Sequence, residues 1–257
     1  MPRFAANLGY LFADRPLVER FGRAVAAGFK AVELQFPYDL PAAAARAEID
    51  RHGLTMLGVN TAATPEGGLA AVPGREPDFA ALLAQALDYV ATLGGTAIHC
   101  MAGTVKPEQR PQAERTFIAN LRRASDRAAA KNVTLLIEPI NSRDRPGYFL
   151  TRAEEAAEIL AKLERPNVRL QFDFYHQQIM GGDLITRFEK HLPFIGHVQM
   201  AGVPARGEPD DGEVNYPAIF AAVDRLGYAG WIGCEYNPRG QTEAGLGWGR
   251  DYGLGAG

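Results

Sequence analysis

Three apolar runs of this 257-residue chain each end on an acidic residue. They are "LLIEP" with Glu138, "LQFD" with Asp173 and "IGCE" with Glu235. A carboxylate at the tip of a buried strand costs free energy unless it is paired or bound to a metal. Carboxylate oxygens are the ligands that hard divalent cations prefer, and they also act as general acids and bases. Three such endings therefore predict that the carboxylates meet at one site.

These runs belong to a series of strand-length apolar segments that alternates with helical patterns along the whole chain. The predicted strands span residues 3–8, 31–36, 55–60, 96–101, 133–138, 168–173, 194–200 and 231–236. The predicted helices span residues 15–27, 41–52, 77–93, 112–130, 151–164, 183–191 and 216–226. Eight strand–helix repeats in about 250 residues are typical of the α/β class, and of a (β/α)8 TIM barrel within it. We predict a single TIM-barrel domain over residues 1–257.

An open, doubly wound sheet is the alternative, but no predicted strand is followed by the GxGxxG fingerprint of that fold. Local signals also mark helix ends. Thr151 with Glu154 three residues later has the pattern of a capping box, and Gly53 and Gly94 stand where C-caps are expected. The glycine-rich end "GLGWGRDYGLGAG" favours a short or frayed last helix over about ten residues.

Side chains alternate along a strand, so one parity of each barrel strand points into the lumen. In "VRLQFD" the apolar parity faces the helices, which sends Arg169, Gln171 and Asp173 inward. In the next strand the polar parity is His197 and Gln199. We expect His197 and Arg169, which lie deeper, to join a hydrogen-bonded network rather than to bind a ligand. The other polar residues of lumen parity are Glu33, Gln35 and Glu235.

The C-terminal rim of a TIM barrel is where its enzymes keep their active sites. Glu138, Asp173, Gln199 and Glu235 fall on that rim, on the fifth to eighth strands. A lone acid at a strand end is usually solvated, but four oxygen-bearing side chains on neighbouring strands predict one hard cation held by oxygen ligands.

Three further residues follow the strands in predicted loops. His176 comes three residues after Asp173, and Arg206 lies in the long loop "VPARGEPDDGEVNYP", which is either a lid over the site or an exposed insertion. Lys106 follows the fourth strand. The residues alone leave the roles of all three open.

Composition excludes several classes of partner. A net charge of −3 and a pI of about 6.0 provide no basic field for nucleic acid or for an anionic membrane. Cys100 and Cys234 lie in apolar runs without CxxC spacing, which predicts reduced, buried thiols. No signal peptide and no transmembrane run is recognisable. We therefore expect a cytoplasmic protein.

Several motifs together resemble the hydroxypyruvate isomerase family of the xylose isomerase-like TIM barrels. They are "ANLGYLF", "ELQFPYD", "LLIEPIN", "QFDFYH", "HVQMAG", "RGEPDDGEVNY" and "GWIGCEY". The resemblance runs from Arg3 to about Trp248. It implies a metal-dependent intramolecular oxidoreductase. Such an enzyme interconverts hydroxypyruvate and 2-hydroxy-3-oxopropanoate (tartronate semialdehyde) through an enediolate.

Carried onto this chain, the resemblance implies one divalent metal ion and no organic cofactor. Magnesium is favoured and manganese is the alternative, because the third ligand position holds a glutamine where many related epimerases have histidine. The implied ligands are Glu138, Asp173, Gln199 and Glu235. Glu138 and Glu235 match the family's proton-transfer pair. The residues implied to bind substrate are His176, Arg206 and Lys106.

Other activities on this type of barrel remain alternatives. A ketose 3-epimerase or a 2-oxo-tetronate isomerase would use the same four ligands. A nuclease would need a cluster of metals rich in histidine, and this chain has five histidines. A sugar-binding protein would not need paired glutamates, and an inosose-type dehydratase is a further candidate. We expect a small hydroxycarbonyl acid or sugar as the substrate, and a homo-oligomer is compatible with the sequence.

Overall fold

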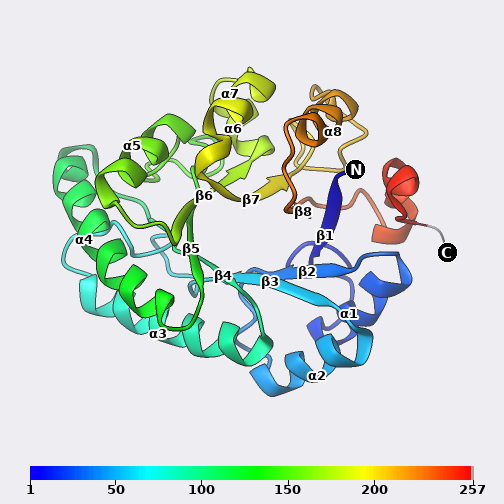
Figure 1. Ribbon diagram of the computed structural model, residues 1–257, viewed down its shortest axis with the longest axis horizontal. Coiled ribbons are helices and arrows are strands. Elements are labelled where there is room, and N and C mark those ends of the chain that lie inside the picture. Colours follow the sequence, from blue (N-terminus) through cyan, green and yellow to red (C-terminus); the bar gives the residue numbers. More distant parts are fainter. Residues whose placement is uncertain (256–257) are drawn as a thin grey trace.

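The computed structural model of the chain, which describes residues 1–255, is a closed barrel of eight parallel strands. The strands follow one another in chain order, and β8 closes the barrel by pairing with β1 (Figure 1). Their bounds are β1 Arg3–Asn7, β2 Ala31–Leu34, β3 Thr55–Asn60, β4 Ala97–His99, β5 Thr134–Ile137, β6 Val168–Asp173, β7 Ile195–Met200 and β8 Trp231–Cys234. The predicted TIM-barrel fold is confirmed.

Helices surround the strands as an outer layer (Figure 1). The α-helices are α1 Leu17–Ala26, α2 Ala42–His52, α3 Glu76–Leu93, α4 Arg110–Ala129, α5 Ala153–Leu163, α6 Phe174–Met180, α7 Leu184–His191 and α8 Tyr216–Arg225. Three short 3-10 helices are η1 Pro107–Gln109, η2 Leu192–Phe194 and η3 Thr242–Tyr252. Helix α6 was not predicted, so the expectation of a loop around His176 was wrong. A seven-residue helix that begins directly at a strand end carries too few residues for a helical period to be visible.

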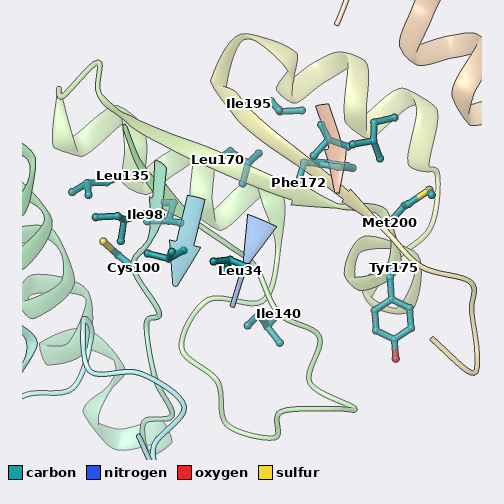
Figure 2. Close-up of a cluster of buried hydrophobic side chains, with 14 of the residues drawn as sticks. Leu34, Ile98, Cys100, Leu135, Ile140, Leu170, Phe172, Tyr175, Ile195 and Met200 are labelled. Atoms are coloured by element: carbon teal, nitrogen blue, oxygen red, sulfur yellow. The ribbon is translucent and has the colours of Figure 1, made fainter. Parts of the chain in front are cut away.

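The apolar parity of the strands packs against the helices, as predicted. Leu170 and Phe172 of β6 belong to a cluster of buried hydrophobic side chains that also holds Met200 of β7 (Figure 2), and the Phe172 ring packs edge-on against Phe188 of α7 with centroids 5.6 Å apart. Both free cysteines are buried, as expected. This apolar layer fixes the register of each strand, because a slip of one residue would turn the apolar side chains into the lumen. The same slip would turn Asp173 outward.

The ends of three helices test the predicted helix-cap signals. Gly53 and Gly94 are C-caps in the left-handed conformation, as predicted. The capping box was assigned to the wrong glutamate. Helix α5 begins after Arg152, and the backbone N–H of Thr151 donates to Glu155, not to Glu154. Glu154 instead pairs with Arg187 of the neighbouring helix α7.

The glycine-rich end forms a short helix, and over the described residues it is packed rather than frayed. Trp248 and Tyr252 of η3 stack edge-on against Phe4 of β1, each with ring centroids 5.0 Å apart. Leu254 is buried. Residues 256–257 lie outside the described part of the chain. No helix within the described residues is long and apolar enough to cross a membrane.

Candidate active site

Three buried carboxylates meet at the C-terminal end of the barrel. Glu138 directly follows β5, Asp173 ends β6 and Glu235 directly follows β8. Their exposed fractions are 4%, 0% and 4%. Asp173 is also the N-cap of α6, where its Oδ1 accepts the backbone N–H of Tyr175 at 2.8 Å. Because the strands lie in register, residues far apart in the chain face one another across the mouth.

Glu138, Asp173 and His176 form a group that can hold a cation. One ligand atom from each lies within 4.8 Å of the others. The His176 Nε2 atom is 3.7 Å from a carboxylate oxygen of each acid. Glu138 Oε1 and Asp173 Oδ2 are buried and have no hydrogen-bond partner among the described residues. Unpartnered buried carboxylate oxygens are costly, and a divalent cation is the species that best compensates them.

Glu235, in contrast, is fully surrounded by donors. Its Oε1 accepts from Arg206 Nη2 at 2.6 Å and from Gln35 Nε2 at 3.1 Å. Its Oε2 accepts from Gln199 Nε2 at 2.6 Å and from Asn7 Nδ2 at 3.0 Å. Glu235 does not belong to the group of possible cation ligands formed by Glu138, Asp173 and His176. The site therefore has an unsatisfied half, on β5 and β6, and a satisfied half on β8.

Arg206 lies over the site between two aromatic rings. Its guanidinium carbon is 5.1 Å from the ring centre of Tyr10 and 4.9 Å from that of Tyr175. The Nε–H group of Arg206 is buried and has no partner among the described residues. The side chain thus binds Glu235 with one end and keeps a donor available for another anion. The loop after β7 accordingly covers the site rather than projecting from the surface.

Two of the predicted site residues, Gln199 and Lys106, differ from the others in their contacts. Gln199 is buried and points into the lumen, but its Oε1 accepts from Gln171 Nε2 at 2.7 Å while its Nε2 faces Glu235. Lys106 is exposed at the N-cap of η1. No hydrogen bond or ion pair among the described residues joins its ammonium group to the carboxylates. The structure thus brings together Glu138, Asp173, His176, Gln199, Arg206 and Glu235, and leaves Lys106 apart.

Burial and mutual repulsion make these acids hard to ionise. Burial raises the pKa of Glu138 well above its ordinary value, and the charges of Glu235 and Asp173 raise it further. Burial also raises the pKa of Asp173 to about 6 and that of Glu235 to about 8, although the Arg206 charge opposes both shifts. Burial lowers the pKa of His176 well below its ordinary value, so this imidazole is neutral.

Sequence reasoning missed His99, which ends β4. Its Nδ1 lies 3.3 Å from Glu138 Oε2, and burial lowers its pKa to about 3. Neither ring nitrogen has a hydrogen-bond partner among the described residues. A signal was present, because a histidine at the end of an apolar strand is as unusual as an acid there. The run "TAIHCM" ends on apolar residues, however, and this hides the polar position inside it.

A second polar layer lies deeper in the lumen, as predicted for His197. The His197 Nε2 atom is 2.5 Å from Glu33 Oε2. Burial alone raises the pKa of Glu33, but the charge and hydrogen bond of His197, with bonds from Gln199 and Asn7, hold it below its ordinary value. Arg169 donates to the backbone oxygen of Ile195 at 3.1 Å. A cavity of about 180 Å³ adjoins this layer.

The fold and the site define a xylose isomerase-like TIM barrel, and the chain belongs to that family, whose model matches residues 21–252. A 2-oxo-tetronate isomerase from Cupriavidus necator is 48% identical over 257 residues, which cover 98% of this chain and 99% of that protein. A hydroxypyruvate isomerase from Escherichia coli is 39% identical, over 96% of this chain and 98% of that protein. The chain is accordingly an isomerase of the hydroxypyruvate isomerase-like group.

A solved structure is similar over the same length. It is described as an AP endonuclease of family 2 from Brucella melitensis, is 45% identical, and matches with a TM-score of 0.96 over 98% of this chain and 99% of that one. The shared architecture therefore covers nearly the whole of both chains.

The raised pKa of Glu235 predicts how stability depends on pH. The folded protein holds this proton up to about pH 8, whereas an unfolded glutamate loses it near pH 4.5. Since the folded state binds more protons in this window, the free energy of unfolding should fall as pH rises, by at most about 1.4 kcal/mol per pH unit for each such proton, and the raised pKa of Glu138 acts in the same direction. We expect this fall between about pH 6.5 and 8, above the histidine titrations. Chemical denaturation in the presence of a chelator measures it.

The Glu235→Gln variant has no titratable group at this position, so its free energy of unfolding should change less with pH than that of the parent. Glu243→Gln is the matched control, because Glu243 pairs with Arg23 at the surface. A parent profile that is level or rising across this window would contradict the raised pKa.

Proposed function

We propose that the protein isomerises a short 2-oxo-3-hydroxy acid, moving the carbonyl group between C2 and C3 through an enediolate. The observation that carries this proposal is the arrangement at the barrel mouth. Two unpartnered carboxylate oxygens, from Glu138 and Asp173, face a site that Arg206 covers with an unpartnered Nε–H group. The two carboxylate oxygens suit a cation, and the guanidinium of Arg206 suits an anion. A substrate that carries a carboxylate next to two neighbouring oxygen-bearing carbons would fit both.

Glu138 and Glu235 are the proposed proton-transfer pair. In the forward direction one carboxylate removes the proton from C3 of hydroxypyruvate, and the electrons of that bond form the enediolate. The other carboxylic acid delivers a proton to C2, while the proton of the C3 hydroxyl passes to the C2 oxygen. The product is tartronate semialdehyde, with the same atoms. The raised pKa values of both glutamates support roles as proton acceptor and donor near neutral pH.

Glu138, Asp173 and His176 would hold a divalent cation, with Gln199 and Glu235 as the further ligands expected from the family resemblance. When bound there, such an ion supplies Lewis-acid stabilisation of the negative charge that develops on the substrate oxygens. Magnesium and manganese fit the carboxylate donors best. His176 is neutral and close enough to bind either the ion or a substrate oxygen.

The substrate itself has two candidates. Hydroxypyruvate is the substrate that the sequence motifs favoured. The second candidate is 2-oxo-tetronate, because relatives named 2-oxo-tetronate isomerase are 48%, 44% and 41% identical to this chain, while relatives named hydroxypyruvate isomerase or putative hydroxypyruvate isomerase are 39% to 44% identical. Both are 2-oxo acids with a hydroxyl on C3, so the same chemistry serves both. The longer acid needs room for one more carbon.

A nuclease function has weaker support, although one similar structure carries such a description. Among the described residues, Glu138, Asp173 and His176 are the one group of three or more histidine, cysteine and acidic side chains arranged to hold a metal. Phosphodiester cleavage with two or three metals needs more ligands than this group contains.

Removing the metal tests the cation site. We expect chelator-treated protein to lose isomerase activity and to recover it with magnesium or manganese. Isothermal titration calorimetry should give one site per chain, and Asp173→Asn should weaken binding at least about tenfold because a charged ligand is lost. Asp210→Asn, which changes an exposed acid beside Arg239, is the control. Unchanged affinity in Asp173→Asn would move the site elsewhere.

Amide variants test the proton-transfer pair. Glu138→Gln and Glu235→Gln should each fold and lose turnover at least about 100-fold, since an amide cannot accept the proton. The remaining glutamate should still exchange one carbon-bound proton with solvent. Deuterium incorporation followed by NMR should therefore be retained for hydroxypyruvate in one variant and for tartronate semialdehyde in the other. Full turnover in either variant would remove that residue from the pair.

Arg206→Lys tests the substrate class. The lysine keeps the charge but loses the planar fork, so KM for both 2-oxo acids should rise more than kcat falls, because ground state and transition state share the contact. An uncharged ketose should be a poor substrate for the parent enzyme. Arg187→Lys, at a pair with Glu154 away from the site, is the control. A preference for the free ketose would instead favour a ketose 3-epimerase.

A further inference from the structure

Glu33 of β2 lies directly beneath the proposed catalytic carboxylates and takes no part in the mechanism above. Its side chain is buried, with His197 of β7 on one oxygen. Lumens of TIM barrels are normally filled by branched apolar side chains, so a carboxylate here requires a reason. Gly233 of β8 makes room for it, because a Cβ on that glycine would lie 2.4 Å from Glu33 Oε1.

Two amide groups lie between Glu33 and Glu235 and bind both. Gln199 Nε2 donates to Glu33 Oε1 at 2.7 Å and to Glu235 Oε2 at 2.6 Å. Asn7 Nδ2 donates to the same two oxygens, at 2.8 and 3.0 Å. An amide nitrogen carries two hydrogens, so each of these nitrogens is fully used. Glu33 and Glu235 are thus joined by two parallel amide bridges.

This arrangement leaves each amide one favourable orientation. The oxygen of Gln199 faces Gln171 Nε2 at 2.7 Å, and that of Asn7 faces the backbone N–H of Gly9 at 2.9 Å. A flipped amide would place its oxygen against two carboxylate oxygens and lose both bonds. The orientation also decides which atom of Gln199 is available to a cation.

Glu235 by itself orients the amides only while it is a carboxylate. Whenever Glu235 is protonated, one of its oxygens carries a hydrogen and no longer favours an N–H group. Glu33 exchanges no proton in the reaction, and both of its oxygens already accept hydrogen bonds. It therefore provides an orienting acceptor that is the same in both protonation states of Glu235.

We propose that Glu33 is a positioning residue that keeps the side-chain amides of Gln199 and Asn7 in one orientation, with their nitrogens towards Glu33 and Glu235 and their oxygens away from both. This rests on the proposed function of the site to which Gln199 and Glu235 belong. Glu33 contacts no substrate, and it acts through the two amides. His197 completes the arrangement by occupying the second oxygen of Glu33.

Two substitutions at Glu33 distinguish the positioning role from an effect of the Glu33 charge and from an effect of side-chain packing. Glu33→Gln can keep an oxygen towards both amides and turn its nitrogen to His197, so it should retain kcat within about fivefold. Glu33→Leu removes the acceptor and should lower kcat about 10- to 100-fold, the usual cost of losing a supporting hydrogen bond at an active site, with KM changed much less. Leu136→Ala, a destabilising change of a buried residue beside the lumen cavity, is the control and should leave kcat near the parent value.

Equal losses in Glu33→Gln and Glu33→Leu would overturn the proposal, because they would assign the effect to charge. Parental kcat in Glu33→Leu would overturn it as well. Both outcomes require measurable turnover by the parent, so failure of the proposed function would be recognised separately.

A measurement that needs no substitution at Glu33 and no activity completes the test. In protein labelled with 15N-glutamine, the Gln199 side-chain amide, assigned with Gln199→Leu, should exchange slowly with solvent in the parent. It should stay protected in Glu235→Gln, which imitates an uncharged residue at that position. Loss of protection in Glu235→Gln would show that Glu235 alone orients the amide, and would overturn the proposal.

Discussion

The placement of four carboxylates inside one closed barrel is the constraint on which the rest of this structure depends. Glu33, Glu138, Asp173 and Glu235 are all buried, where charges repel strongly and water cannot screen them. Hydrogen-bond donors are distributed unevenly among these four carboxylates. The protein gives Glu33 and Glu235 a complete set of donors, and it leaves an oxygen of Glu138 and one of Asp173 without any among the described residues. The second pair is where an external charge gains most, so the uneven distribution of donors marks the place of a ligand.

Arg206 is the cation that makes this charge density tolerable, and its position depends on the loop after β7. Its backbone has a φ of 55°, a conformation that costs a non-glycine residue about 1–2 kcal/mol. The backbone N–H of Asn237 donates to the oxygen of Arg206 at 2.8 Å. Nearby, the buried Glu208 forms an ion pair with Arg239, with 3.0 Å between Nε and Oε2, and accepts the backbone N–H of Arg239 at 3.0 Å. These contacts tie the loop after β7 to the segment after β8, and so hold the guanidinium over Glu235.

Strand parity could be predicted from the sequence because it is a local property. Alternation in "VRLQFD" placed Gln171 and Asp173 in the lumen, and the same rule placed His197. The residues that each lumen side chain contacts could not be predicted in this way. That Glu33 meets His197, 164 positions further along the chain, follows from how the barrel closes, and no window of sequence contains that information. Helix α6 and the pairing of Glu155 with Thr151 were missed for a related reason, because tertiary contacts decide between near-equal local choices.

The site divides its tasks between elements of different kinds. The proposed proton-transfer residues and Asp173 come from strand ends, whose positions the barrel fixes, while Arg206 comes from a loop. The amides that bridge Glu33 and Glu235 lie on β1 and β7, inside the same rigid framework. A change in the loop can therefore alter the position of the guanidinium without moving the carboxylates. In the proposed function, the strands would then keep the proton-transfer chemistry fixed, and the loop that carries Arg206 would decide which substrate anion is accepted.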